Sequence, residues 1–196
     1  MTSMPDLVPA ARRMAGLVAG VRDAQLTAPT PADMSLGTLL DHVNGLALAF
    51  TWAARKEFPD ALSQPPSSDA SRLPDDWRTR IPEQLDALGA AWRSPDAWQG
   101  MTRAGGLDLP GQDAGHVAMN ELVVHGWDIA RASGQPYDPG ADEIETCLLF
   151  VAPSVEESGG KGIEGLFGPA VDVPADAPPL DRLIAMTGRR PDWTTG

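Results

Sequence analysis

The sequence contains only one cysteine, Cys147, so the chain cannot form an internal disulfide bond. Long apolar runs are absent as well. The longest stretch, Leu46 to Ala54, is interrupted by Thr51 and is far shorter than the roughly 20 residues that a membrane-spanning helix needs. The N-terminal residues do not show the basic segment and following apolar run of a secretory signal. We therefore expect a cytoplasmic protein with no membrane partner.

Basic residues are also few, and two common functional motifs are missing. The chain has 15 lysines and arginines against 27 aspartates and glutamates, which gives a formal net charge of −12. This charge repels nucleic-acid phosphates, and the densest basic cluster is only Arg189 and Arg190, so we expect no nucleic-acid partner. There is no Gly-x-Ser-x-Gly nucleophile elbow, and residues 159–162 lack the spacing of a phosphate-binding loop.

The apolar residues that are present follow the period of helices. With 42% hydrophobic and 21% charged residues, the 196-residue chain has the composition of one globular domain spanning residues 1–196. Apolar side chains recur at steps of three and four residues in four long segments, as on the buried face of a helix. Ser35 suits an N-cap and Gly134 a C-terminal cap. The sequence therefore predicts an all-α, bundle-like fold with principal helices over residues 7–21, 36–55, 77–92 and 112–133.

The other segments predict additions to these helices. Residues 94–111 are rich in glycine and proline and predict a short hairpin-like excursion. A fifth helix is predicted after Gly140, and residues 180–187 predict one last short helix in a C-terminal extension. Pro82 and Pro153 lie inside predicted helices. Because proline removes a backbone donor, we expect each of them to kink or to bound its helix.

The sequence contains only three histidines, and two of them suit a metal site. Glu121 and His125 are four residues apart on a predicted helix, so their side chains project from the same face, one turn apart. His42 lies in the middle of the second predicted helix, and a bundle can turn it toward the same point. Two imidazoles and a carboxylate suit zinc or nickel, and three protein ligands leave a fourth position for water or substrate. His116 points to a different side of the helix from His125, so we do not expect it to be a ligand.

Neighbouring residues are compatible with this site without requiring it. Gly45, on the face of His42, costs roughly 1 kcal/mol relative to alanine in a helix and leaves room above the imidazole. Asp128, one turn beyond His125, is either a hydrogen-bond acceptor for the other ring nitrogen or a solvated residue. The spacing of Glu121 and His125 equally suits an ordinary intrahelical ion pair, so spacing alone leaves the metal site open. No catalytic base can be assigned from the sequence.

Several stretches of the sequence resemble one known family. Residues 120–132, Asn-Glu-Leu-Val-Val-His-Gly-Trp-Asp-Ile-Ala-Arg-Ala, resemble a signature of the actinobacterial DinB-like metal-binding proteins. These proteins are related to the N-terminal domain of mycothiol-dependent maleylpyruvate isomerase. Residues 39–43, Leu-Leu-Asp-His-Val, resemble the histidine-bearing second helix of that superfamily. The stretches 167–169, 178–183 and 187–191 are similar to the tail of the family, so the resemblance extends from near the start of the chain to its end.

This resemblance implies a DinB-like four-helix bundle of up-down-down-up topology with a metal site in its core. The second-helix histidine of the family falls on His42, and its Glu-x-x-x-His pair falls on Glu121 and His125. The resemblance therefore implies these three residues as ligands of a divalent metal, Zn²⁺ or Ni²⁺. Related enzymes are thought to use the metal to bind a low-molecular-weight thiol such as mycothiol. The chain has no counterpart of the separate C-terminal domain of the full isomerase, which argues against maleylpyruvate isomerisation itself.

Three functional hypotheses follow for the site. The leading one is a metal-dependent S-transferase or isomerase in which mycothiol attacks an electrophilic substrate, because coordination favours the thiolate over the thiol. The second is a hydrolase that uses metal-bound hydroxide at the same site. The third is a protein that binds a metal or another ligand without catalysis. The expected partners are thus small molecules, and an exposed tryptophan face would allow a homodimer.

Overall fold

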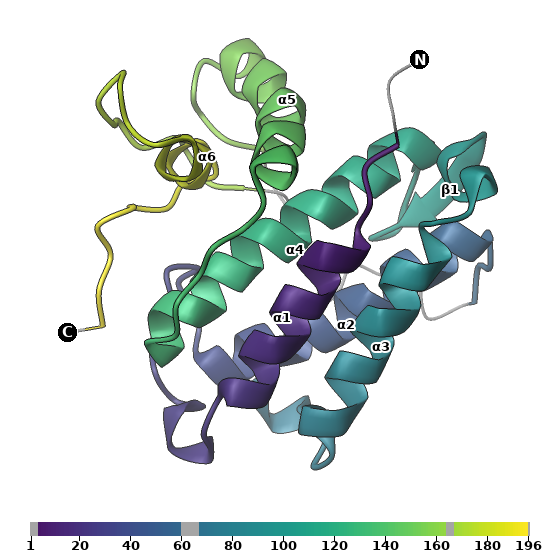
Figure 1. Cartoon of the computed structure of the whole chain (residues 1–196), viewed down its shortest axis with the longest axis horizontal. Coiled ribbons are helices and arrows are strands. Elements are labelled where there is room, and N and C mark those ends of the chain that lie inside the picture. Colours follow the sequence, from purple (N-terminus) through teal and green to yellow (C-terminus); the bar gives the residue numbers. More distant parts are fainter. Residues whose placement is uncertain (1–3, 60–66, 164–166, 196) are drawn as a thin grey trace.

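The computed structural model describes residues 4–59, 67–163 and 167–195, and most of these residues are helical (Figure 1). The predicted predominantly helical fold is confirmed. α1 and α2 each pack against both α3 and α4. Four helices thus enclose a shared core, and they are α1 (Val8–Gly20), α2 (Leu36–Arg55), α3 (Trp77–Ala91) and α4 (Gly111–Ser133).

The helix ends that position the core follow from capping chemistry. The Ser35 side chain accepts a hydrogen bond from the backbone N–H of Thr38 over 3.2 Å, which confirms Ser35 as the N-cap of α2. Gly134 ends α4 in the left-handed region, with φ of 71°, a conformation that costs glycine little. Both predicted caps are therefore present, and they set the start of the helix that carries His42 and the end of the helix that carries His125.

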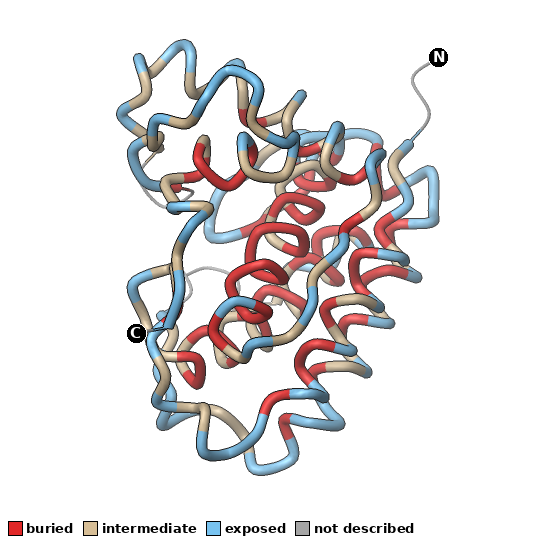
Figure 2. The backbone as a smooth tube through the Cα atoms, turned by 60° about the vertical axis from the view of Figure 1, so that its left-hand side comes forward, coloured by how far each residue is buried: buried red, intermediate tan, exposed pale blue. Residues whose placement is uncertain are grey.

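α4 is the most deeply buried helix of the molecule. Buried residues line the inner sides of the other helices but run along nearly the whole of α4 (Figure 2). The reason is that α4 packs against α1 and α2 on one side and against α5 on another. The buried polar side chains on α4, among them His125 and Asp128, are consequently removed from water and require partners within the protein.

A short hairpin precedes α4, as the sequence predicts. Its strands are β1 (Met101–Ala104) and β2 (Leu107–Pro110), and they pair in antiparallel register. Gly105 and Gly106 form the turn with positive φ angles of 58° and 81°, which suit a two-residue hairpin loop. Within the residues that the structure describes, the connections contain three short 3-10 helices, namely η1 (Asp23–Gln25), η3 (Ala70–Arg72) and η4 (Pro95–Trp98). Residues 60–66, between α2 and η3, lie outside the described residues.

The C-terminal extension consists of α5 (Ala141–Glu157), α6 (Pro179–Met186) and the segment that follows. α5 packs against α4, and α6 packs against α5, on the side of α4 away from α3 (Figure 1). A helix near 180–187 is thereby confirmed.

Neither proline bounds its helix. α3 begins five residues before Pro82, at Trp77, and α5 continues past Pro153 to Glu157. The alternative in which these prolines start or end their helices is therefore excluded, and a kink at each proline stays a prediction. Each proline deprives the carbonyl four residues earlier of its donor, but those residues, Arg78 and Leu149, are exposed and water can serve the carbonyl.

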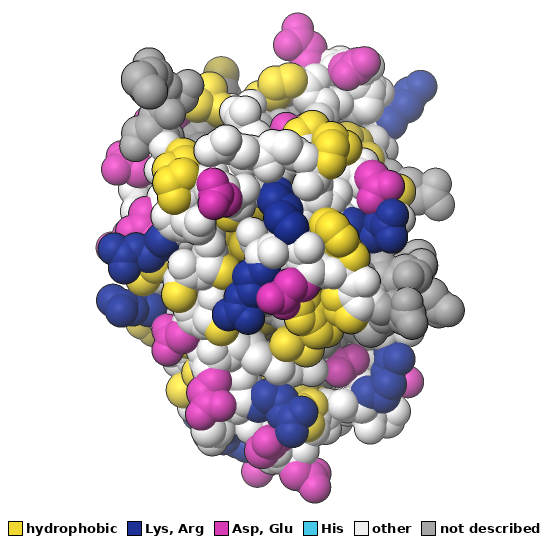
Figure 3. All heavy atoms as spheres, turned by 90° about the vertical axis from the view of Figure 1, so that its right-hand side faces the viewer, with side chains coloured by type: hydrophobic (Ala, Val, Ile, Leu, Met, Phe, Trp, Pro, Cys, Tyr) yellow, Lys and Arg dark blue, Asp and Glu magenta, His cyan; other side chains and the backbone are white. Residues whose placement is uncertain are grey.

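The surface shows no exposed tryptophan face. All six tryptophans lie among the described residues, and each is buried or half-buried, so the premise of the expected homodimer is wrong. The homodimer itself stays a prediction. On the face drawn in Figure 3, acidic, basic and apolar side chains are interspersed. Within the described residues, no helix has the length and apolar character required to cross a membrane.

Candidate metal centre

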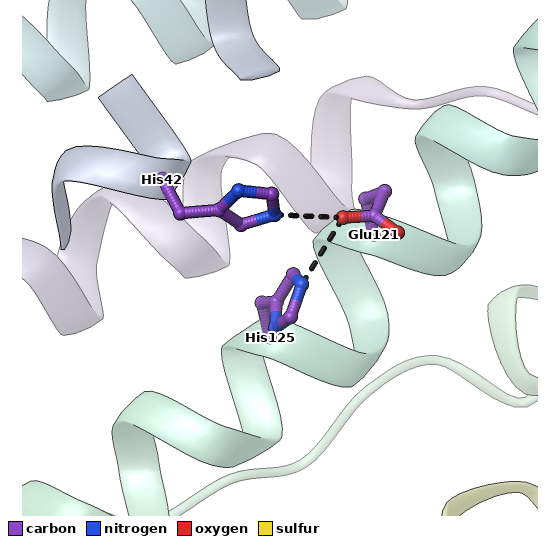
Figure 4. A group of neighbouring side chains, drawn as sticks. All are labelled: His42, Glu121 and His125. Carbon is purple, nitrogen blue, oxygen red and sulfur yellow. Dashed lines mark hydrogen bonds and ion pairs between the residues drawn. The ribbon is translucent and has the colours of Figure 1, made fainter. Parts of the chain in front are cut away.

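Three predicted ligand residues come together where α2 packs against α4. His42 projects from the middle of α2, and Glu121 and His125 project from one face of α4 (Figure 4). The Oε2 atom of Glu121 lies 3.2 Å from Nε2 of His42 and 3.1 Å from Nε2 of His125. One ligand atom from each residue lies within 4.8 Å of the other two. The structure therefore gathers all three residues around one point.

The two separations at Glu121 Oε2 and the chemistry of the three donor atoms are compatible with a tetrahedral cation. With ligand bonds of about 2.0–2.2 Å, neighbouring ligand atoms of a tetrahedral zinc site lie about 3.3–3.6 Å apart. The two separations to Glu121 Oε2, 3.2 and 3.1 Å, are close to that value. The two imidazole rings meet edge to face, with centroids 4.9 Å apart and an angle of 81° between their planes. Two imidazole nitrogens and one carboxylate oxygen are a donor set that zinc and nickel accept.

A buried carboxylate holds the other ring nitrogen of His125. Nδ1 of His125 lies 2.9 Å from Oδ2 of Asp128, whose side chain is fully buried. Asp128 is therefore the hydrogen-bond acceptor and not the solvated residue, which settles the two alternatives that the sequence left open. In the neutral imidazole, an Nδ1–H that donates to Asp128 leaves Nε2 as the lone-pair nitrogen, and Nε2 is the atom that faces Glu121.

Arg189 completes this arrangement from the C-terminal extension. Its guanidinium donates to both carboxylate oxygens of Asp128, with Nη2 2.9 Å from Oδ2 and Nε 3.1 Å from Oδ1. Sequence reasoning placed Arg189 in a basic cluster and in the stretch 187–191 that resembles the tail of the family, but it assigned the residue no role. The two residues are 61 positions apart, and no spacing rule connects them, so the sequence alone offered no signal for this pair.

The charges of the site support one another despite their burial. Burial opposes ionisation of Glu121, but the charge of His125 and hydrogen bonds from His125 and His42 outweigh it and hold the Glu121 pKa well below its usual range. Burial alone would lower the pKa of His125, but the Glu121 charge and the hydrogen bond to Asp128 raise it to about 9. For Asp128, burial is outweighed by the Arg189 charge and the His125 hydrogen bond, which lower the pKa. Without a bound cation, His125 is thus protonated at neutral pH.

The site is partly exposed to solvent at His42 and Glu121. The side chain of His42 is 21% exposed, and that of Glu121 is 14% exposed. Gly45 lies one turn beyond His42, and a Cβ added there would meet no atom within 4 Å. The room predicted beside His42 is therefore present. Two cavities of about 190 and 490 Å³ lie elsewhere, between α1 and α3 and between α5 and the start of α6.

His116 and Cys147, two other side chains of types that can bind metals or act in catalysis, lie apart from the site. His116 lies against Trp98 and Phe150, with ring centroids 5.9 and 6.2 Å away, and burial lowers its pKa. It is not among the clustered ligands, as its helical position predicts. Burial also raises the pKa of the Cys147 thiol far above its ordinary value, so this cysteine stays protonated and unreactive.

Comparison with known proteins identifies the family. The family model of the mycothiol maleylpyruvate isomerase N-terminal domain matches residues 7–130. The chain belongs to this family. The family match confirms the resemblance noted in the sequence, and it extends from α1 almost to the end of α4. It includes His42, Glu121, His125 and Asp128, whereas Arg189 lies beyond it.

Relatives of this family member include two proteins of Mycobacterium tuberculosis. They are the uncharacterized proteins MT0763 of strain CDC 1551 and Rv0738 of strain H37Rv. Each is 26% identical to the chain over 177 residues, which cover 89% of the chain and 91% of the relative. No solved structure matches the chain. The similarity to these relatives therefore extends past residue 130, where the family match ends, into the C-terminal extension.

Proposed function

We propose that this protein is a divalent-metal-dependent thiol S-transferase or isomerase whose thiol substrate is mycothiol or a closely similar small thiol. The observation that carries the proposal is the meeting of two imidazole Nε2 atoms at one carboxylate oxygen of Glu121, in a chain that belongs to the mycothiol maleylpyruvate isomerase N-terminal domain family. The DinB-like up-down-down-up order of the four core helices is part of the same proposal.

The chain's own residues divide the work at the site. His42, Glu121 and His125 would hold a Zn²⁺ or Ni²⁺ ion, and Asp128 would orient His125. A bound divalent cation would supply the positive charge that favours a thiolate over a thiol. Glu121 contributes one negative charge, while the charges of Asp128 and Arg189 offset each other. The dication would therefore keep a net positive charge toward an anionic sulfur.

The partial exposure of the site supports the approach of a small substrate. Gly45, one turn from His42, adjoins open space, and the His42 side chain itself is partly exposed. In the proposed transfer, the thiol loses its proton to water, its sulfur forms a bond to an electrophilic carbon, and the leaving group departs from that carbon. The walls of the site are α2 and α4, and substrate selectivity depends on the residues that these helices present there.

Metal analysis tests the first half of this proposal. Protein purified without chelator and supplied with Zn²⁺ or Ni²⁺ should retain about one ion per chain. His125→Ala should bind more than about 100-fold more weakly, because loss of a ligand exceeds the 10–100-fold effect typical of its hydrogen-bond partners. His116→Ala is the matched control, since His116 lies outside the cluster. Absence of stoichiometric metal in the wild type would refute a metal site.

Thiol consumption tests the second half. Metal-loaded wild-type protein, mycothiol and a panel of electrophiles should consume thiol faster than the same mixture with His42→Ala. Equal rates in wild type and His42→Ala, with metal still bound to the wild type, would identify a metal-binding protein without transferase activity. Ester or amide cleavage by the wild type without thiol consumption would identify the hydrolase instead.

A further inference from the structure

The C-terminal extension is connected to the candidate metal centre by an unbroken chain of side chains. Arg189 donates to Asp128, and Asp128 accepts from Nδ1 of His125, whose Nε2 faces Glu121. The Asp128 side chain is fully buried, and that of Arg189 is 11% exposed. Both hydrogen bonds between the three residues measure 2.9 Å. A residue that follows α6 therefore contacts the partner of a proposed ligand on α4.

Arg189 is itself held in place by the fold of its segment. Its Nη1 donates to the carbonyl of Thr187 over 2.8 Å, and its backbone N–H donates to the carbonyl of Ile184 over 3.1 Å. Gly188 has φ of 85°, and a Cβ there would lie 2.9 Å from the backbone of Gly168. Only glycine fits this close approach, so the turn directs Arg189 back toward α4.

A second contact holds the same segment on α4. The guanidinium of Arg131, near the end of α4, donates to the carbonyl of Pro191. Leu183, Ile184 and Ala185 of α6 are buried, and α6 packs against α5. The segment 187–191 therefore lies against α4 beside the candidate metal centre. Within this segment, the guanidinium of Arg189 pairs with the buried carboxylate of Asp128.

We propose that Arg189 is a positioning residue for metal binding, which rests on the function proposed above. By pairing with Asp128, Arg189 fixes the carboxylate that holds the His125 imidazole with Nε2 directed at the metal position. Docking of the segment 187–191 and binding of the metal then strengthen each other, because a coupling between two binding events is reciprocal. Loss of Arg189 would leave the buried Asp128 carboxylate without its positively charged partner. The carboxylate could then rotate, and the His125 imidazole that it holds would turn away from the metal position.

The metal affinity of the full chain tests whether Arg189 strengthens metal binding. We expect Arg189→Ala to weaken Zn²⁺ binding by about 10–100-fold in competition with a chelator, the range typical of residues that orient metal ligands. Arg190→Ala is the matched control. Its side chain is the next arginine, is 71% exposed and pairs only with Asp192 among the described residues, so its affinity should equal that of the wild type. Arg189→Lys, which keeps the charge but not the two-pronged contact, should recover part of the loss.

A double-mutant cycle shows whether Arg189 acts through Asp128. Asp128→Asn should weaken Zn²⁺ binding by a similar factor, and Asp128→Asn combined with Arg189→Ala should cause little further loss. The visible spectrum of bound Co²⁺ should change in the same variants, since the ligand geometry changes. Asp128→Asn also decides the matter if Arg189→Ala does not fold, because wild-type affinity in Asp128→Asn would overturn the proposal.

Hydrogen exchange tests whether metal binding in turn stabilises docking of the segment 187–191. Zn²⁺ should slow exchange in peptides covering residues 180–195 of the wild type, but not of His42→Ala, which lacks a ligand and keeps the Asp128–Arg189 pair. Unchanged exchange on adding Zn²⁺ to wild type that binds it would overturn the reciprocal coupling. Wild-type Zn²⁺ affinity in Arg189→Ala would overturn the positioning role and leave the metal site intact. Failure of the wild type to bind Zn²⁺ would overturn the proposed function and this inference together.

Discussion

At the residue scale, one oxygen atom organises the site. Oε2 of Glu121 is within 3.2 Å of His42 Nε2 and 3.1 Å of His125 Nε2, so a single carboxylate oxygen balances two imidazoles. The pairing of Glu121 with His125 follows from their four-residue spacing, which any α-helix translates into one shared face. The four-residue spacing of Glu121 and His125 does not distinguish a metal site from an ordinary intrahelical ion pair, because both have this spacing.

Proton release should accompany metal binding. The pKa of His125 is raised to about 9 when no cation is bound, so His125 carries a proton at pH 7.5 that the metal must displace. We expect release of about one proton per Zn²⁺ by titration calorimetry in buffers of different ionisation enthalpy. Zn²⁺ affinity should rise about tenfold per pH unit below pH 9 and level off above it, because deprotonated His125 no longer needs to lose a proton.

The control for this prediction is Arg190→Ala, whose substitution lies outside the hydrogen-bonded chain of the site. It should show the same proton release as the wild type. A Zn²⁺ affinity that stays constant between pH 7 and pH 8 would contradict a protonated His125 in the metal-free protein.

At the element scale, α4 combines the candidate metal centre with close packing against two tryptophan rings. Asp128 and His125 lie on one face of α4, while Gly115, nearer its start, receives the rings of Trp98 and Trp92. α2 differs on the face that carries His42, because Gly45 adjoins empty space. Glycine is therefore required by close packing at Gly115 of α4, whereas at Gly45 of α2 the space would admit a larger side chain.

Alanine at these two glycines should change stability in opposite directions. In Gly115→Ala, the new methyl would lie 2.4 Å from Trp98 and 2.9 Å from Trp92, so we expect a loss of about 1–3 kcal/mol of unfolding free energy. Gly45→Ala meets nothing within 4 Å and should gain about 0.5–1 kcal/mol from reduced backbone entropy in the unfolded chain. Urea unfolding of the metal-free proteins, followed by circular dichroism, measures both changes. Equal effects of the two substitutions would show that the packing around Gly115 is looser than described.

At the scale of the whole molecule, metal binding should stabilise the fold. The ligands come from two helices of the core, so a cation bound there joins α2 to α4 in the native state only. Zn²⁺ at about 1,000 times its dissociation constant should add about 4 kcal/mol. For a domain of this size that corresponds to a rise of about 8–16 °C in Tm by scanning calorimetry. His42→Ala should show no such rise. An equal rise in both proteins would place the stabilising metal elsewhere.

Local spacing in the sequence was sufficient for the helices, for the caps at Ser35 and Gly134, and for the shared face of Glu121 and His125, because each depends on residues within a few turns of one another. The position of His42 came from the family resemblance, since residue 42 lies 79 positions before Glu121 and no period relates them.

Only the tertiary structure decided that Asp128 is buried against Arg189, that the residues whose carbonyls the prolines leave free are exposed, and that the tryptophans are buried or half-buried. These features arise when distant segments pack together, and packing determines which polar groups lose water and which partners they find.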